Sequence, residues 1–133
     1  MPNLVWKKEY AIGIDSIDDQ HKAILLVFNS FLLRADADSY ATSYRDLGRL
    51  IDEHFEHEER IMRKYKLPNS TEHKAWHAKI REDYKNSAND EVNERTIGRM
   101  RGRLYTWIVN HILNDEMDRG IAIHLRRMGV YQK

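Results

Sequence analysis

Apolar residues recur at every third or fourth position through most of the chain, which is the spacing of one face of an α-helix. The pattern predicts an all-α protein with four helices, separated by short polar stretches. In chain order, the predicted bounds are Ser16 or Asp18 to about Asp36, Asp38 or Ser39 to about Tyr65, Asn69 to about Asn86, and Asp90 to at least Asp118.

Two local features mark the boundary between the second and third predicted helices. Pro68 ends the second helix, because proline has no amide hydrogen and clashes with the preceding turn. Asn69, with Glu72 three residues later, resembles a capping box that opens the third helix. Since the connections are short, we expect an antiparallel up-down four-helix bundle. The whole chain, 1–133, is predicted to be one domain, with an N-terminal arm over 1–17, the bundle over about 18–118 and a C-terminal tail over 119–133.

Several histidines lie within the predicted apolar stripes, where polar residues are unusual. Residues four apart on a helix lie about 40° apart on one face, so their side chains can point to one place. The second helix offers a histidine and a carboxylate at that spacing, the third offers a pair of histidines, and the first and fourth offer one histidine each. These candidates are His21, His54, Glu58, His73, His77 and His111.

A metal site explains this pattern better than isolated buried histidines. Unpaired polar groups in a core cost several kcal/mol each, whereas a metal ion takes neutral imidazole and ionised carboxylate as ligands. Five imidazoles exceed what one tetrahedral zinc ion uses, and they suit a pair of octahedral ions that share carboxylates. Iron suits such nitrogen and oxygen donors.

Composition narrows the alternatives. The chain has 133 residues, a formal net charge of +1 and no cysteine, which excludes disulfides, thiolate metal sites and a strong electrostatic attraction to nucleic acid. No apolar run approaches the length of a membrane span, and the N-terminus lacks the apolar region of a signal peptide. We therefore expect a cytoplasmic protein that binds neither nucleic acid nor a membrane. We also expect a monomer.

Four motifs resemble the hemerythrin family, and its single-domain bacterial members in particular. They cover nearly the whole chain. The motifs are the opening Trp6, Tyr10, Gly13-Ile14, Ile17-Asp18 and Gln20-His21-Lys22, then His54-Phe55 with Glu58-Glu59, then His73 with His77, and finally Trp107-Ile108-Val109-Asn110-His111-Ile112.

The resemblance implies two iron ions joined by an oxo or hydroxo bridge, with molecular oxygen as the ligand. Carried over, it assigns His73, His77 and His111 to one iron, and His21 and His54 to the other. It makes Glu58 a bridge between them. An oxygen pocket would be lined by Trp107, Ile108 and Ile112.

One position departs from the family pattern. The family has its second bridging aspartate five residues after the last histidine, and here that position is Glu116. Asp115 lies about 40° from His111 on an ideal helix, and Glu116 about 140° away. We favour Glu116, whose longer side chain can reach around the helix, with Asp115 as the alternative.

Two residues next to the candidate ligands of the second helix are not expected to bind metal. His57 lies 60° from His54 on the helix, so we place it on the flank of the bundle. Glu59 is either an outer partner of a ligand imidazole or an ordinary surface residue.

The resulting expectation is a binding protein, not an enzyme, which carries, stores or delivers oxygen, with an unidentified protein acceptor left open. One alternative is oxygen or redox sensing through a partner protein. Another is a di-iron peroxidase or oxidase whose chemistry is altered by Glu116, and a weaker one is metal storage or a zinc-bound structural bundle.

Overall fold

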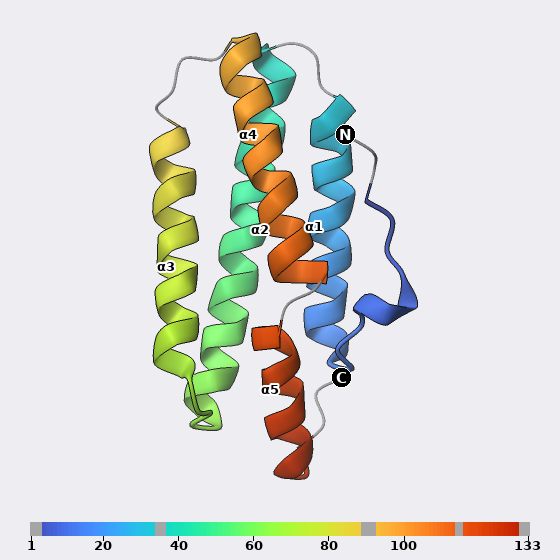
Figure 1. Ribbon diagram of the computed structural model, residues 1–133, viewed down its shortest axis with the longest axis vertical. Coiled ribbons are helices and arrows are strands. Elements are labelled where there is room, and N and C mark those ends of the chain that lie inside the picture. The colour runs from blue at the N-terminus through green and yellow to red at the C-terminus, as the bar shows by residue number, and fades with distance from the viewer. Residues whose placement is uncertain (1–3, 34–36, 89–92, 114–115, 131–133) are drawn as a thin grey trace.

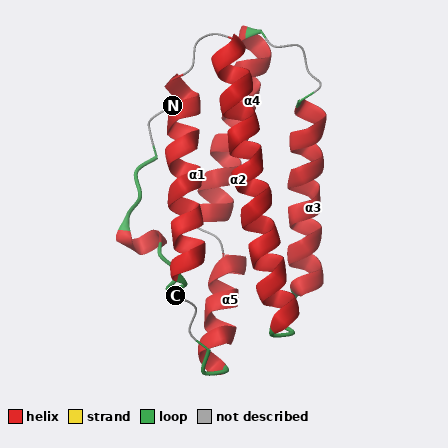
Figure 2. Cartoon of the chain, turned by 180° about the vertical axis from the view of Figure 1, so that it is seen from behind, coloured by secondary structure: helices red, strands yellow, loops and turns green. Residues whose placement is uncertain are grey.

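The computed structural model shows an all-α protein, as predicted (Figures 1 and 2). It describes residues 4–33, 37–88, 93–113 and 116–130, without the side chains of Leu33, 37–39, His111, Leu113 and Glu116. The elements are a 3₁₀ turn at Lys8–Tyr10, α1 (Asp15–Leu33), α2 (Ala37–Lys64), α3 (Ser70–Ser87), α4 (Glu94–Trp107), a π-helix at Ile108–Leu113 and α5 (Glu116–Arg127).

Helices α1 to α4 run alternately up and down and form the predicted four-helix bundle (Figure 1). The turn between α2 and α3 is closed by backbone hydrogen bonds, because Leu67 N–H donates to the Met62 carbonyl and Lys66 N–H donates to the Arg63 carbonyl. Lys66 adopts a φ of 49°, the left-handed conformation that this kind of helix end requires. Asn69 precedes α3 but makes no side-chain cap, so the predicted capping box is absent there.

The predicted fourth helix is divided into three elements. It begins at Glu94, with Asn93 as its cap, and α-helical geometry ends at Trp107. A π-helix follows, and then the separate helix α5 (Figure 1). Most of the segment that we expected to be a tail is therefore helical.

The N-terminal arm is packed against the bundle. Leu4 N–H donates to the Asn29 side-chain oxygen at 2.9 Å, and Asn29 donates back to the Leu4 carbonyl at 2.7 Å. Further along, the Asp18 carboxylate of α1 accepts the backbone N–H groups of Ile12 and Gly13 at 2.9 and 3.2 Å. Gly13 has a φ of 89°, a conformation that favours glycine. The glycine and the Asp18 hydrogen bonds together specify this turn.

Helix α5 is held by this same arm. Arg126 donates to the Ile12 carbonyl at 3.1 Å, and Arg119 donates to the Glu9 carbonyl at 2.7 Å. Ile121 and Leu125 of α5 belong to one apolar cluster with residues of the arm, α1 and the lower half of α2. The arm therefore holds α5 in place together with α1 and α2.

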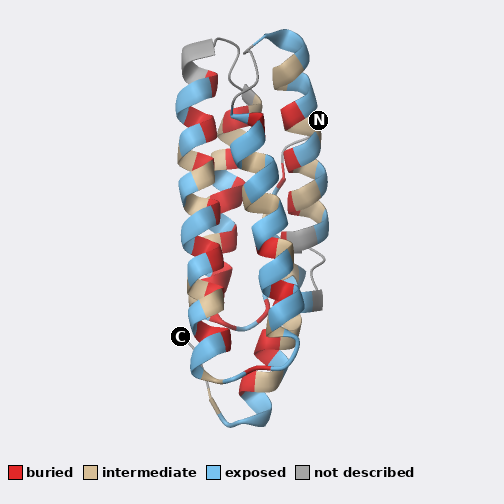
Figure 3. Ribbon diagram, turned by 90° about the vertical axis from the view of Figure 1, so that its left-hand side faces the viewer, coloured by how far each residue is buried: buried red, intermediate tan, exposed pale blue. Residues whose placement is uncertain are grey.

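Buried positions line the inner faces of the helices (Figure 3). In the part of the chain that the structure describes, no helix is both long and apolar enough to cross a membrane.

Candidate metal centre

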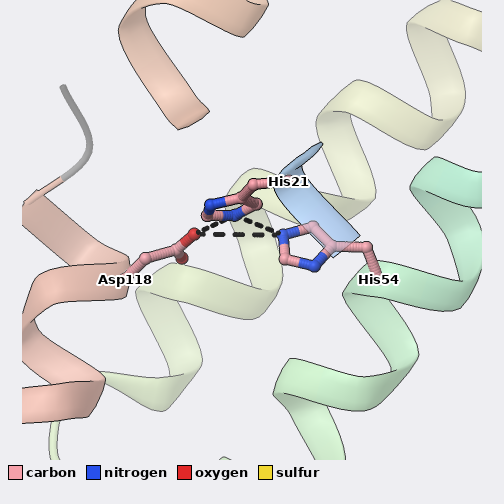
Figure 4. A group of neighbouring side chains, drawn as sticks. All are labelled: His21, His54 and Asp118. Atoms are coloured by element: carbon pink, nitrogen blue, oxygen red, sulfur yellow. Dashed lines mark hydrogen bonds and ion pairs between the residues drawn. The ribbon is translucent and has the colours of Figure 1, made fainter. Parts of the chain in front are cut away.

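Six buried imidazole and carboxylate side chains meet inside the bundle. They form two groups, each with ligand atoms within 4.8 Å of one another, namely His21, His54 and Asp118, and Glu58, His73 and His77. The first group comes from three helices, α1, α2 and α5 (Figure 4). Local helical spacing supplies the pairs on α2 and α3, whereas packing between helices joins the groups.

The first group brings several nitrogen and oxygen lone pairs within hydrogen-bond distance of one another. His21 Nε2 lies 3.1 Å from His54 Nε2 and 3.0 Å from Asp118 Oδ2. His54 Nε2 also lies 2.7 Å from Glu58 Oε1. Each neutral imidazole has one N–H, so hydrogen bonds alone cannot satisfy all these lone pairs. A bound cation can.

Both carboxylates lie between the two groups. The Glu58 oxygens are 2.7 Å from His54 Nε2, 3.5 Å from His73 Nε2 and 3.7 Å from His77 Nε2. The Asp118 oxygens are 3.0 Å from His21 Nε2 and 3.4 Å from His73 Nε2. Each carboxylate thus contacts imidazoles of both groups, as a carboxylate bridging two ions requires.

The outer nitrogens of two imidazoles are held by acceptors. His77 Nδ1 lies 3.0 Å from Glu59 Oε2, and His54 Nδ1 lies 2.7 Å from Gln20 Oε1. Because a carboxylate only accepts, His77 carries its proton on Nδ1 and presents the lone pair of Nε2 to the centre. Metal-bound histidines usually make such an outer hydrogen bond. Of the two expectations for Glu59, the structure favours the role of outer partner.

Glu59 is itself held in place by Arg81. The guanidinium donates to Glu59 at 2.9 Å and to Asp52 at 2.8 Å. The same guanidinium lies 5.3 Å from the ring centre of Phe55. Phe55 in turn stacks on His77, with centroids 3.9 Å apart and planes 9° apart. The His77 ring is therefore fixed both by a hydrogen bond and by stacking.

Electrostatics favour neutral His77 and ionised Asp118, the forms that a metal binds. Burial, reinforced by the neighbouring His73, lowers the pKa of His77 to about 3, so this imidazole is neutral at physiological pH. Burial alone would raise the pKa of Asp118. Hydrogen bonding to Glu58, His21 and His73 outweighs burial and holds the Asp118 pKa well below its usual range.

Sequence comparison agrees with this arrangement. Residues 12–118 match the family described as the hemerythrin HHE cation binding domain. The chain belongs to the hemerythrin family. A bacteriohemerythrin of Pseudomonas aeruginosa is 30% identical over 120 residues, which cover 87% of this chain and 78% of that protein. One from Stenotrophomonas maltophilia is also 30% identical, over 124 residues with the same coverage. A myohemerythrin of Riftia pachyptila is 27% identical over 108 residues, covering 81% of this chain and 83% of that protein.

Five of the seven ligands expected from the sequence lie together in this hemerythrin centre, namely His21, His54, Glu58, His73 and His77. The side chains of His111 and Glu116 lie outside the described part of the structure, as does Asp115 altogether. Of the residues expected to line an oxygen pocket, Ile108 and Ile112 are buried, and Trp107 is half-buried with its ring 5.9 Å from that of Phe55.

Asp118 is the residue that our reading of the sequence missed. It lies seven residues after His111, two more than the family spacing that led us to Glu116. On a continuous α-helix, seven residues complete nearly two turns, so heptad spacing could have identified it. The π-helix at Ile108–Leu113 lies between α4 and Asp118, and a π-helix holds more residues per turn than an α-helix. The two additional residues between His111 and the carboxylate therefore occur where the chain changes from α-helix to π-helix.

His57 belongs to neither group. Its Nε2 lies 2.8 Å from the Ser16 hydroxyl on the flank of the bundle, and the residue is half-buried.

Proposed function

We propose that this hemerythrin-family chain binds molecular oxygen reversibly at a pair of iron ions, for oxygen carriage, storage or delivery. Six of the proposed ligands are the residues named from the sequence, and Asp118 replaces Glu116 as the seventh. The proposed set is His21, His54, Glu58, His73, His77, His111 and Asp118.

The observation that carries this proposal is the position of the two buried carboxylates between two groups of imidazoles. A single ion would leave one group of nitrogens without a cation. Two ions that share Glu58 and Asp118 use every inward donor atom of both groups. Nitrogen and oxygen donors without thiolate suit iron, and the family membership supports the same metal.

When bound, the iron pair would supply the electrons by which oxygen is held and then released. The chain supplies orientation and a dry environment. Glu59 and Gln20 hold ligand imidazoles with the Nε2 lone pair directed inward. Buried Ile108 and Ile112 are the proposed apolar wall, which limits access of water to the bound oxygen.

Binding, as opposed to catalysis, is favoured by the identity of the second carboxylate. The peroxidase or oxidase alternative depended on a longer bridge at Glu116. Asp118 offers an aspartate, the residue type of the family pattern, so this reason for altered chemistry no longer applies. Sensing through a partner would use the same site and would differ only in the events after oxygen has bound.

An anaerobic optical experiment tests the proposal. Protein produced with ample iron should contain about two iron ions per chain. After reduction under argon, exposure to air should produce new near-ultraviolet and visible absorption, and a return to argon should reverse it. One ion per chain, zinc in place of iron, or irreversible oxidation on the first exposure would contradict the proposal.

Two histidine variants form a matched control. His54→Ala should lose at least one iron, because His54 Nε2 lies among the inward donors. His57→Ala should keep both, because His57 bonds to Ser16 instead. Equal losses would mean that this face of α2 is wrongly assigned.

A further inference from the structure

The six buried donors differ in how closely they approach solvent. His21, His54, Glu58, His77 and Asp118 have no exposed surface, whereas His73 is 4% exposed. An ion must therefore cross a protein layer to reach the centre. His73 lies where that layer is thinnest among the described ligands.

A cavity of about 270 Å³ reaches His73 from outside. It lies between α5 and the turn that joins α2 to α3, at the end of the bundle where both are found (Figure 1). Two other cavities, of about 620 and 310 Å³, lie along α4 and are lined by none of the six donors. Of these three cavities, only the one beside α5 touches the centre.

The walls of this cavity combine apolar side chains with oxygen and nitrogen donors. Met62, Leu67 and Ile121 supply apolar surface. Glu72 on α3 and His124 on α5 supply a carboxylate and an imidazole from two different helices, with His73 also in the lining. Glu72 is exposed and His124 half-buried, so both are accessible before the buried ligands are reached.

This arrangement matches the physical requirement for moving a divalent cation inward. A hydrated ion that enters an apolar passage loses solvation at a large cost in free energy. Donors placed along the passage replace water molecules one at a time and lower that barrier. Carboxylate and imidazole are suitable ligands for first-row divalent metals.

We propose that this cavity is the uptake route for the metal ions, and that Glu72 and His124 form a transient cation site in it. Ions bind first to these two side chains and then pass to His73. The inference rests on the proposed metal centre, but it concerns the rate of loading and not the final number of ions.

Uptake of Co(II) by metal-free protein under argon tests the transient site. Co(II) alone is the probe, and its visible absorption on binding is followed by stopped flow. The double variant Glu72→Gln with His124→Asn should load about tenfold more slowly than the parent chain, which corresponds to roughly 1.4 kcal/mol in activation free energy. The final number of Co(II) ions should be unchanged.

Gly120 allows the passage itself to be tested. It lines the cavity, and an added Cβ there would meet no atom within 4 Å. Gly120→Leu should therefore narrow the passage and slow loading, whereas Gly120→Ala should load at nearly the parent rate. Gly98→Leu is the matched control, because Gly98 on α4 is equally uncrowded and lies outside the lining of all three cavities.

The possible outcomes separate the two proposals. Unchanged loading in the double variant overturns the transient site, and equal slowing by Gly98→Leu overturns the route. A double variant that binds fewer ions at equilibrium would make Glu72 or His124 a permanent ligand, which also overturns the proposal. If the parent chain binds no pair of ions, the proposed metal centre itself fails.

Discussion

The two ends of the bundle share helices α1 to α3 but bury different kinds of side chain. At one end, which we call the aromatic end, the interior is filled by Phe28, Phe31, Tyr40, Tyr44 and Tyr84. At the other, the metal end, it is filled by the six imidazole and carboxylate donors, next to the apolar cluster that includes α5.

The aromatic end is complete with protein groups alone. Tyr44 and Tyr84 stack with centroids 4.1 Å apart, and the hydroxyl of each donates to the backbone carbonyl of the other. Burial, followed by the neighbouring Tyr44, raises the pKa of Tyr84, so its hydroxyl remains a donor. At the metal end, by contrast, lone pairs face one another. The comparison indicates that one end is packed with aromatic rings, whereas the other gathers the donors that could hold metal ions.

Among single substitutions, the largest expected effect is at the metal end, from Asp118→Asn. This change removes the negative charge between His21 and His73. The affinity for at least one metal ion should fall by more than about 100-fold, which exceeds the loss typical when a residue that only hydrogen-bonds to a ligand is mutated. Glu116→Gln should bind two ions as before. Metal titration of both variants decides between these carboxylates, and loss of an ion in Glu116→Gln alone would return the bridge to Glu116.

Removal of the metal should destabilise the protein strongly and unevenly. An ion present at about 100 times its Kd stabilises the folded state by about 2.7 kcal/mol, so a pair contributes roughly 5 kcal/mol. Urea unfolding with and without metal measures the difference. Amide hydrogen exchange should show that protection falls most around α5 and the ligand positions, and least around Tyr44 and Tyr84. A uniform loss would mean that the two ends are not independent.

Gly48→Ala should disturb the aromatic end while leaving the metal end intact. A Cβ at Gly48 would lie 2.7 Å from Tyr84 Cε1, and the ring cannot easily move because it is stacked on Tyr44. The expected cost is about 1–3 kcal/mol by urea unfolding, with an unchanged number of metal ions. Gly98→Ala, which meets no atom within 4 Å, should instead stabilise the helix by up to about 1 kcal/mol.

The smallest expected effect comes from Arg126→Ala, which loosens the contact between α5 and the arm. Loss of the hydrogen bond to the Ile12 carbonyl should cost about 1 kcal/mol in metal-free protein. Because α5 carries Asp118, metal affinity should fall as well. Arg127→Ala, at an exposed neighbouring position, provides the control in both measurements. Unchanged affinity in Arg126→Ala would show that the arm does not position Asp118.

Much of the metal centre was predictable because it depends on short-range helical geometry. His54 with Glu58, and His73 with His77, share a face at any point of a regular helix, and the apolar stripes indicate which face is buried. The same periodicity placed His57 on the flank, where it contacts Ser16. Pro68 marked the end of α2 to within a few residues.

The sequence by itself therefore determined the all-α class, the inward positions of His21, His54, His73 and His77, and the family to which the chain belongs. Only the tertiary structure placed Asp118 beside the imidazoles of His21 and His73, and Glu59 against His77. The physical reason is that helical periodicity predicts direction only while the helix continues. Beyond Trp107 the geometry changes to a π-helix, and the position of α5 then depends on contacts with the arm, more than 100 residues away in the chain.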